Sequence, residues 1–330
     1  MRALISREPG GPETLKMTEV ATPVARQGQV LIEIKACGVN YPDVLTIQDK
    51  YQVKAPRPFS PGAEVAGVVV AVGPGVSDFE IGQKVVARTG TGGMAEYIAV
   101  GVDRCNHMPN GIPFEDAAVM QFTFETAYYA LVTRARIKHG ESVLVLGAGG
   151  GVGSAAVQIA RNLGAIVVAA ASSERKVAFA REVGADKAFI YPQNEPEDKR
   201  AVVAALRDSL GQQGANIVVD PVGGWLSEPA FRCLAEDGRF LVLGFTAGIA
   251  SLPMNLPLLK NGDVMGINWR TFTLQQRERA VANKAILERW YREGRLSPGI
   301  SAKFPLEEGG QAIKLVADRR VVGKVVVTMP

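Results

Sequence analysis

Residues 141–160, Glu-Ser-Val-Leu-Val-Leu-Gly-Ala-Gly-Gly-Gly-Val-Gly-Ser-Ala-Ala-Val-Gln-Ile-Ala, decide how this chain is expected to fold. The short apolar run at 143–146 is typical of a buried strand. Glycines crowd into residues 147–153, and a small, apolar, helix-compatible run follows. Glycine has no β-carbon, so this backbone can approach a pyrophosphate, whose charge the free N–H groups at a helix start stabilise. We therefore predict a strand, a phosphate-binding turn and a helix, rather than a glycine-rich loop without a ligand.

The composition is that of an ordinary globular protein of about two domains, with 330 residues, 47% hydrophobic and 21% charged. The net charge is +4, and no basic block carries interleaved aromatic residues, which argues against a nucleic-acid partner. Three scattered cysteines predict no disulfide framework. The chain start lacks the apolar core of a signal peptide, and no apolar run approaches the roughly 20 residues that cross a bilayer. We expect a cytoplasmic protein without a membrane segment.

The hydrophobic pattern divides the chain into three parts. Short strands at 30–36, 64–72, 82–88 and 95–100 predict a barrel-like or sandwich domain. Helices are expected at 115–120 and 125–132. Strands and helices then alternate up to residue 243, the pattern of a doubly wound parallel sheet with helices on both faces. A charged helix at 276–293 and a terminal strand at 323–328 follow. We assign residues 1–120 to the first domain, 121–262 to the α/β domain and 263–330 to a return to the first domain.

The residues after the second α/β strand indicate which dinucleotide is bound. Folds that bind NAD carry an acidic residue about twenty residues after the glycine turn, but this strand is followed by Ser172, Ser173, Arg175 and Lys176. Hydroxyl groups and cations can hold a 2′-phosphate, which an acidic residue would repel. A serine here can also cap the next helix, a role compatible with phosphate binding, whereas Glu174 argues against a phosphate. We predict NADPH as the cofactor.

The sequence offers little for a metal ion. The chain has two histidines, His107 and His139. The pair formed by Cys105 and His107 lacks the two further ligands that a zinc ion needs. Cys37 is interpreted as a small buried residue at a strand end. We therefore expect no metal site.

With these residues assembled, the chain resembles the medium-chain dehydrogenase/reductase superfamily, specifically its zinc-free quinone oxidoreductase branch. In Cys-Gly-Val-Asn-Tyr-Pro-Asp at 37–43, Asn40 stands where zinc alcohol dehydrogenases carry a cysteine ligand. In Pro-Gly-Ala-Glu at 61–64, Ala63 stands where they carry a histidine ligand. Further segments that resemble the family's motifs are the glycine turn, Asp-Pro-Val-Gly-Gly at 220–224, Gly-Phe at 244–245 and Gly-Lys at 323–324.

The resemblance implies an α/β protein with two domains. A GroES-like, mainly-β catalytic domain would be built from both chain ends, and a Rossmann domain would be inserted between them, with a cleft that holds NADPH. A homodimer joined through edge strands of the Rossmann sheets is also implied. The apolar segment at 249–259 suits such an edge, and can equally be a buried loop.

The resemblance also implies catalytic residues. Asn40 would hydrogen-bond the nicotinamide carboxamide or a substrate oxygen. Tyr41 or Tyr51 would donate from its phenol to a developing enolate or hydroquinone oxygen. The sequence does not order the two tyrosines, and either ring can instead pack at the domain interface. Asp43 is interpreted as a helix-cap or structural carboxylate more readily than as a proton relay.

The remaining implied contacts are with the cofactor. They are Thr126 on the nicotinamide side; Gly149, Gly150, Gly151 and Val152 at the pyrophosphate; Ser172, Ser173, Arg175, Lys176 and Tyr191 around the 2′-phosphate and ribose; Gly244, Phe245 and Thr246 against the nicotinamide ring; and Lys324 from the returning tail. Trp269 and Arg270 either line the substrate mouth or are a core tryptophan and a surface arginine.

The chemistry that fits is hydride transfer from the nicotinamide to an electron-poor acceptor, with the protein supplying orientation and water exclusion. No histidine–serine relay or zinc ligand set is visible that would polarise an alcohol or a ketone, which favours acceptors that are already activated. A quinone is the first expectation. An enoyl thioester or enone, with a carbon–carbon double bond conjugated to a carbonyl, is the alternative. A cofactor-binding protein without relevant turnover is disfavoured, because the cofactor residues and the candidate active-site residues are all present.

Overall fold

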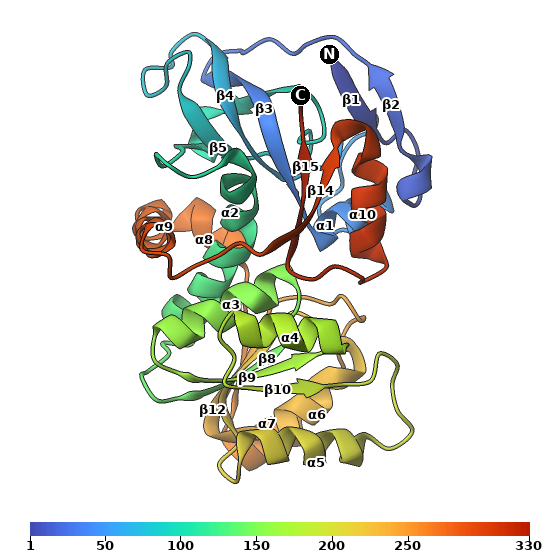
Figure 1. Cartoon of the computed structure of the whole chain (residues 1–330), viewed down its shortest axis with the longest axis vertical. Helices are drawn as coiled ribbons and strands as arrows, with labels where there is room; N and C mark the ends of the chain where they lie inside the picture. The colour runs from blue at the N-terminus through green and yellow to red at the C-terminus, as the bar shows by residue number, and fades with distance from the viewer. The chain divides into compact units, whose positions relative to one another are not determined.

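The structure, a computed structural model, describes residues 1–330 and divides into two compact units (Figure 1). Unit 1 comprises Met1–Gln121 and Ile300–Pro330, and unit 2 comprises Phe122–Gly299. The return to the first domain therefore falls at residue 300, not at residue 263 as expected. Residues 263–299 remain with unit 2 because strand β13 (Asp263–Gly266) pairs with its sheet. No helix combines the length and the apolar character that a membrane span needs.

Unit 1 is mainly β. Its larger sheet has seven strands in the order β14-β15-β3-β4-β5-β7, with β6 paired to β3, and a two-stranded sheet joins β1 to β2. The strands are β1 (Arg2–Ile5), β2 (Lys16–Glu19), β3 (Gln29–Val39), β4 (Glu64–Val72), β5 (Lys84–Arg88), β6 (Tyr97–Gly101), β7 (Cys105–His107), β14 (Ile300–Pro305) and β15 (Lys324–Thr328). The C-terminal strand β15 pairs antiparallel with β3, so both chain ends build one domain, as expected.

The helices of unit 1 lie at the ends of its strands. They are α1 (Tyr41–Ile47), α10 (Gly309–Ala317) and most of α2 (Phe114–Tyr128), with short 3-10 turns η1 (Pro12–Thr14), η2 (Val102–Arg104) and η5 (Leu306–Glu308). We expected two helices at 115–120 and 125–132. The structure has one continuous helix, α2, extended by a π-helical segment, η3 (Tyr129–Arg134). Residues 121–124 are Gln-Phe-Thr-Phe and contain neither glycine nor proline, so nothing interrupts the helix.

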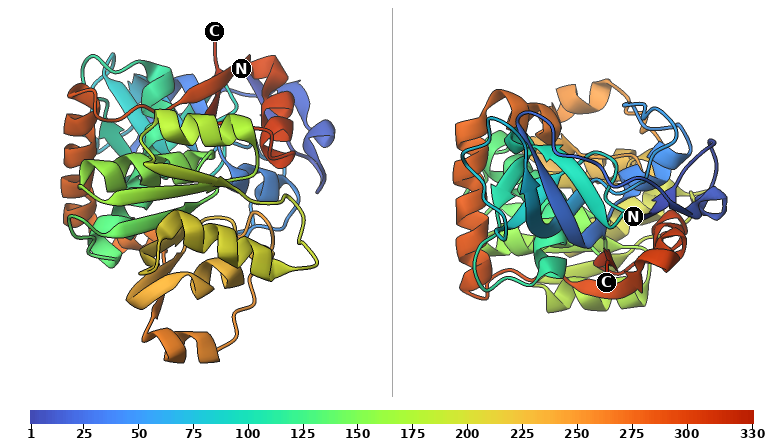
Figure 2. Two further views of the ribbon diagram at one scale, coloured as in Figure 1. Left: turned by 60° about the horizontal axis from the view of Figure 1, so that its bottom comes forward. Right: turned by 90° about the horizontal axis from the view of Figure 1, so that it is seen from above.

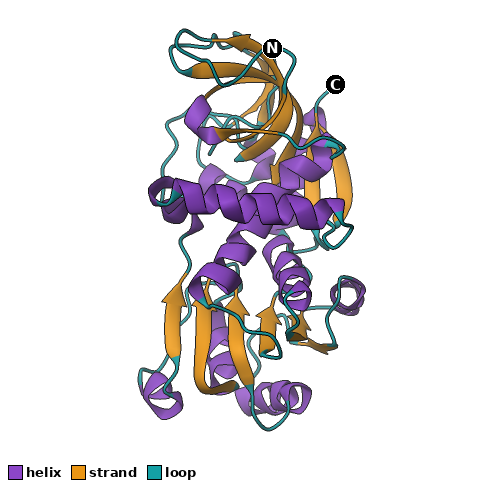
Figure 3. Ribbon diagram, turned by 90° about the vertical axis from the view of Figure 1, so that its left-hand side faces the viewer, coloured by secondary structure: helices purple, strands orange, loops and turns teal.

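Unit 2 contains the predicted doubly wound parallel sheet. Its six strands run in the order β10-β9-β8-β11-β12-β13, and all neighbours are parallel (Figure 3). They are β8 (Ser142–Leu146), β9 (Ile166–Ala171), β10 (Lys187–Ile190), β11 (Ala215–Asp220), β12 (Leu234–Val242) and β13. The strand order reverses beside β8, whose neighbours are β9 and β11. Dinucleotides bind outside the carboxyl ends of the strands at such a switch point.

Helices cover both faces of this sheet. Helices α3 (Gly151–Asn162) and α4 (Glu174–Glu182) lie on one face, and α5 (Lys199–Leu210) and α6 (Ser227–Arg232) on the other (Figure 2, left). Further elements are η4 (Gly224–Leu226), α7 (Asn255–Lys260), α8 (Trp269–Gln275) and α9 (Arg277–Arg292). Aromatic contacts fasten α8 and α9 to the helix that opens unit 2: Tyr129 stacks on Phe272 at 4.2 Å between ring centroids, and Tyr128 meets Trp290 edge-on at 5.8 Å.

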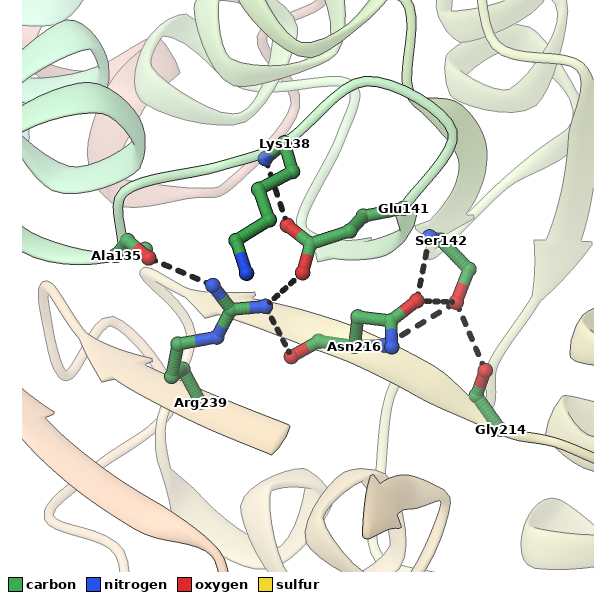
Figure 4. A network of polar contacts seen from close by, with 7 residues as sticks. All are labelled: Ala135, Lys138, Glu141, Ser142, Gly214, Asn216 and Arg239. Carbon is green, nitrogen blue, oxygen red and sulfur yellow. Dashed lines mark hydrogen bonds and ion pairs between the residues drawn. The ribbon is translucent and has the colours of Figure 1, made fainter. Parts of the chain in front are cut away.

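A polar network ties the amino ends of the central strands of unit 2 together (Figure 4). The Arg239 guanidinium donates to the carbonyl of Ala135 at 2.7 Å and pairs with the Glu141 carboxylate at 2.5 Å. Next to it, the Ser142 hydroxyl donates to the carbonyl of Gly214 at 2.8 Å. This network lies at the opposite ends of the strands from the expected cofactor position, so its role is structural.

Candidate active site

The glycine turn has the geometry that a phosphate cradle requires. Gly147 adopts a φ of +59°, a left-handed conformation that side chains disfavour. A β-carbon on Gly153 would lie 2.2 Å from the Gly147 carbonyl oxygen, so the helix can start this close to the strand only without a side chain. No side chain caps the start of α3 at Gly150. The first N–H groups of this helix are therefore left for a ligand.

The expected 2′-phosphate residues lie directly beside this turn. A β-carbon on Gly149 would lie 2.5 Å from the β-carbon of Lys176, which shows how closely the two segments approach. The Lys176 ammonium donates to the Ser172 hydroxyl at 3.3 Å, and Ser173 caps α4 by accepting from the Lys176 N–H at 3.4 Å. The structure thus shows Ser173 as a helix cap and leaves phosphate binding compatible with it. Arg175 is exposed on the same turn.

The other cofactor residues of unit 2 occupy loops that follow its strands. Tyr191 comes directly after β10 and is half-buried. Phe245 follows β12 and keeps 49% of its surface exposed. Thr246 donates weakly to the carbonyl of Pro221 at 3.5 Å, which links the loops after β11 and β12. The N–H of Gly244 donates to the backbone carbonyl of Asp220 at 3.3 Å, which also connects these two segments.

Asp220 has a structural role that the sequence alone did not assign. Its carboxylate accepts from the N–H groups of Val222 and Gly223, both at 2.8 Å, and from the Ser227 hydroxyl at 2.5 Å. Burial raises the pKa of this carboxyl, and these hydrogen bonds oppose the shift. The Asp-Pro-Val-Gly-Gly motif therefore shapes the loop after β11.

Two polar side chains on α2 are buried without a hydrogen-bond partner. One is the hydroxyl of Thr126, which was expected on the nicotinamide side. The other is the amide of Gln121, in which neither the oxygen nor the nitrogen is paired. Leaving such groups unpaired costs about 1–3 kcal/mol each. The observation on Thr126 agrees with a role in ligand binding. No motif in the sequence pointed to Gln121.

Unit 1 brings Asn40 into a buried network of charged groups. Its amide oxygen accepts from the Lys324 ammonium at 2.6 Å, and its amide nitrogen donates to the Glu64 carboxylate at 2.7 Å. Lys324 also pairs with Glu64 at 3.2 Å and donates to the carbonyl of Val39 at 3.1 Å. Adjacent strands create this meeting, because Gly38 on β3 pairs with Glu64 on β4, and Val39 pairs with the residue after Lys324 on β15. Glu64 was named in the sequence only as part of a motif.

This network changes the expectation for Lys324. An ammonium group has three N–H donors, and all three are used within the network, by Val39, Asn40 and Glu64. The side chain is only 3% exposed. The structure thus places Lys324 in the Asn40 network, and its expected contact with the cofactor stays a prediction that would require one of these hydrogen bonds to break.

Asp43 supports the same region from the start of α1. Its carboxylate accepts from the N–H of Asn40 at 2.8 Å and from the N–H of Gly62 at 3.1 Å, which makes it the structural carboxylate that was expected. Burial is the main cause that raises the pKa of Asp43 to about 6. The neighbouring Cys37 thiol is fully buried, and burial raises its pKa well above the ordinary value.

The two tyrosines flank this region and differ in their surroundings. Tyr41 is the first residue of α1 and is partly buried against the core of unit 1. Tyr51 lies in the loop after α1 and is half-buried. Their order as proton donors stays open. In unit 2, Trp269 is buried with an edge contact to Phe122 at 5.5 Å, and Arg270 is exposed. This agrees with a core tryptophan and a surface arginine, and a place of Arg270 at the substrate mouth stays a prediction.

Comparison with known proteins identifies the family. The alcohol dehydrogenase GroES-like domain matches residues 26–110, and the zinc-binding dehydrogenase domain matches residues 151–286. Rat quinone oxidoreductase-like protein 2 is 35% identical over 99% of this chain and 92% of its own length. A mycobacterial structure complexed with NADPH is 28% identical, covers 99% of this chain and 100% of its own, and has a TM-score of 0.91. The CurK enoyl reductase is 26% identical over 100% of this chain and 99% of its own, with a TM-score of 0.86.

These matches span both units and agree with the GroES-like and Rossmann architecture. The chain belongs to the medium-chain dehydrogenase/reductase superfamily, in its quinone oxidoreductase-like branch, as the sequence resemblance predicted.

One matching domain model is named zinc-binding dehydrogenase, but this chain lacks the residues that a zinc ion requires. Asn40 and Ala63 replace the cysteine and histidine ligands of the zinc alcohol dehydrogenases. No group of three or more histidine, cysteine, aspartate or glutamate residues is placed to hold a metal ion. The Asn40 side chain instead forms hydrogen bonds with Lys324 and Glu64. These residues do not fit a zinc ion.

Proposed function

We propose that this protein is an NADPH-dependent oxidoreductase that transfers hydride to a quinone. The observation that carries the proposal is the placement of Lys176 against the glycine turn, with Gly149 and Lys176 too close for a second side chain. A dinucleotide whose pyrophosphate binds at the start of α3 would therefore have a cation and two hydroxyl groups nearby, and these groups can hold the separate 2′-phosphate of NADPH. The NADPH-bound mycobacterial relative supports the same assignment.

In this proposal each group of residues has one task. Gly149, Gly150, Gly151 and Val152 hold the pyrophosphate by backbone N–H groups. Ser172, Ser173, Arg175, Lys176 and Tyr191 hold the 2′-phosphate and ribose, and Gly244, Phe245, Thr246 and Thr126 hold the nicotinamide. When bound, NADPH supplies the hydride. The protein orients the ring and excludes water, effects that can lower a barrier by about 7–11 kcal/mol.

A quinone fits the residues of unit 1. Asn40 can donate a hydrogen bond without changing its charge, and Tyr41 or Tyr51 can donate to an oxygen that becomes negative. A quinone is already electron-poor and needs little help from an acid. The names of the quinone oxidoreductase relatives support this choice of acceptor.

An enoyl thioester or enone is the second candidate, and the likeness to the CurK enoyl reductase favours keeping it. Reduction of such a double bond passes through an enolate, which requires a nearby donor. A tyrosine variant therefore separates the two candidates. Tyr51→Phe would lower enone turnover much more than quinone turnover if the phenol is that donor.

The direct test measures NADPH oxidation with a naphthoquinone and, in parallel, with crotonyl-CoA, with NADH as the control. Rapid oxidation with the quinone alone supports the first proposal, and rapid oxidation with the thioester alone replaces it by the second. Tight NADPH binding without turnover of either would indicate a cofactor-binding protein. Equal rates with NADH and NADPH would contradict the role of residues 172–176.

We also propose a homodimer formed through strand β13, the outer strand of the unit 2 sheet. The segment before it is not a buried loop: Met254 is 80% exposed and Leu258 is 78% exposed. An outer strand beside exposed apolar side chains favours pairing with a second copy. Light scattering during size-exclusion chromatography would give the mass, and Leu258→Glu would convert a dimer into a monomer. A wild-type monomer at micromolar concentration would contradict the proposal.

A further inference from the structure

The buried network around Asn40 holds a full ion pair that no step of the proposed reaction uses. Lys324 is 3% exposed and Glu64 is 1% exposed. Burying two charges is costly, and a buried pair is often no more stabilising than apolar residues of the same volume. Its presence beside a candidate active-site residue therefore calls for a role other than stability.

The contacts of the pair define the orientation of the Asn40 amide. The ammonium of Lys324 approaches the amide oxygen at 2.6 Å, and the carboxylate of Glu64 approaches the amide nitrogen at 2.7 Å. Rotating the amide by half a turn would place N–H groups against the ammonium and an oxygen against the carboxylate. Both contacts would then be repulsive, so the pair permits only one orientation.

This orientation limits what Asn40 can offer to a ligand. The amide oxygen accepts from Lys324 and also faces the N–H of Asp43 in the capping box of α1, so the protein already supplies donors for its two lone pairs. The amide nitrogen has two N–H groups, and Glu64 accepts one of them. The remaining N–H can donate only to an acceptor, such as a carbonyl oxygen.

The surrounding backbone is shaped to admit the pair. A β-carbon on Gly38 would lie 2.4 Å from the Glu64 carboxylate oxygen and 2.8 Å from the carbonyl of Ala118. The N–H of Asn40 is held by Asp43 at 2.8 Å, which fixes the main chain from which the amide projects. The ion pair contacts the amide itself, and Asp43 holds the backbone that carries it.

We propose that Glu64 and Lys324 are positioning residues that fix the Asn40 amide as a hydrogen-bond donor to a carbonyl oxygen of the bound acceptor or of the nicotinamide carboxamide. The proposal rests on the proposed function insofar as Asn40 contacts the ligand. It assigns the pair an effect that is transmitted through Asn40 and through no other residue.

The test replaces the whole pair, because removing one partner would leave an unpaired buried charge and endanger folding. Glu64→Met/Lys324→Met removes both charges and both contacts while preserving side-chain volume. Asn40→Ala removes the amide itself, and a third variant combines all three changes. Each protein is assayed with NADPH and a naphthoquinone, and NADPH affinity is measured by fluorescence titration.

Positioning predicts strong non-additivity. The pair variant and Asn40→Ala should each lower kcat/KM, or NADPH affinity if the carboxamide is the partner, by about 10- to 100-fold, the range for one lost hydrogen bond to a bound group. The combined variant should lose no more than either alone. Losses that multiply, or a folded pair variant with wild-type kinetics and affinity, would overturn the proposal.

A second measurement needs no turnover. In protein labelled with ¹⁵N-asparagine, the Asn40 side-chain resonances are those that disappear in Asn40→Ala. Slow hydrogen exchange is expected in the wild type for the N–H that Glu64 accepts. In the pair variant this protection should be lost and the chemical shifts of the amide group should move. Unchanged Asn40 resonances there would refute positioning, even if the wild type reduces no acceptor and the proposed function fails.

The matched control is the ion pair of Glu141 and Arg239, which is also largely buried, with both side chains 15% exposed. Glu141→Met/Arg239→Met should change stability but leave the Asn40 resonances and kcat/KM within about twofold of the wild type. Equal losses of kcat/KM in both pair variants would show a general effect of ion-pair removal and would overturn the proposal.

Discussion

Replacing Asp43 by asparagine tests how burial controls the charge of the network. The carboxyl is buried, and its pKa in the folded protein is about 6, against an ordinary value of 3.8. Two backbone N–H groups, from Asn40 and Gly62, already donate to it, and burial still dominates the shift. Asparagine resembles the protonated carboxyl in shape and does not titrate. The variant should therefore lose the pH dependence that Asp43 gives to stability.

The sign follows from the direction of the shift. Because the folded protein holds the proton to a higher pH than the unfolded chain does, the stabilisation from protonation is fully present below pH 3.8 and is lost as the pH rises through about 6. At about 1.4 kcal/mol per pH unit, this interval corresponds to about 3 kcal/mol. Of that amount, about 2 kcal/mol should be lost between pH 4.5 and pH 7.

The assay is urea unfolding of the wild type and of Asp43→Asn at about pH 4.5 and about pH 7. Other groups titrate equally in both proteins, so they cancel when the two unfolding free energies are subtracted. The wild type should become less stable relative to the variant by about 2 kcal/mol at the higher pH. A difference that is independent of pH, or that moves in the opposite direction, would refute the reasoning.

Three further substitutions test other parts of the structure. Lys176→Ala should raise the Kd for NADPH about tenfold or more and leave the Kd for NADH within about twofold, because only NADPH carries the 2′-phosphate. Fluorescence titration measures both values. Equal effects on the two cofactors would contradict the assignment of Lys176 to the 2′-phosphate. Gly153→Ala would place a β-carbon 2.2 Å from the carbonyl oxygen of Gly147, so urea unfolding should show a loss of about 1–3 kcal/mol or more. Its control, Gly150→Ala, meets that same oxygen at 3.5 Å and should cost less than about 1 kcal/mol. Gln121→Met removes an unpaired buried amide and should stabilise the ligand-free protein by about 1–3 kcal/mol; a lower Tm would contradict this.

The glycine turn shows what the sequence by itself determined. Strand, turn and helix follow each other along the chain. Glycine is needed at Gly147 because of its own positive φ, and at Gly153 because a β-carbon there would meet the Gly147 carbonyl six residues earlier. The alternation of strands and helices likewise predicted a parallel sheet, because short connections and strand patterns are local properties.

The end of the α/β domain depended on long-range pairing. Residues 263–266 are a short segment with no strong pattern, and only their pairing with β12 shows that they extend the unit 2 sheet. The state of the segment at 249–259 was open for a similar reason, since an apolar run can be buried or exposed. The structure exposes Met254 and Leu258 in it.

The network around Asn40 was decided by the tertiary structure alone. Asn40 lies 24 residues from Glu64 and 284 residues from Lys324, and no local pattern connects them. Their meeting depends on the register of three adjacent strands, β4, β3 and β15. Motifs in the sequence pointed to Asn40 and Lys324 as site residues. Which group pairs with a buried charge, however, depends on which strands lie side by side. For this reason the sequence could not predict the ion pair of Lys324 with Glu64 that the structure shows, and the contact of Lys324 with the cofactor stays a prediction.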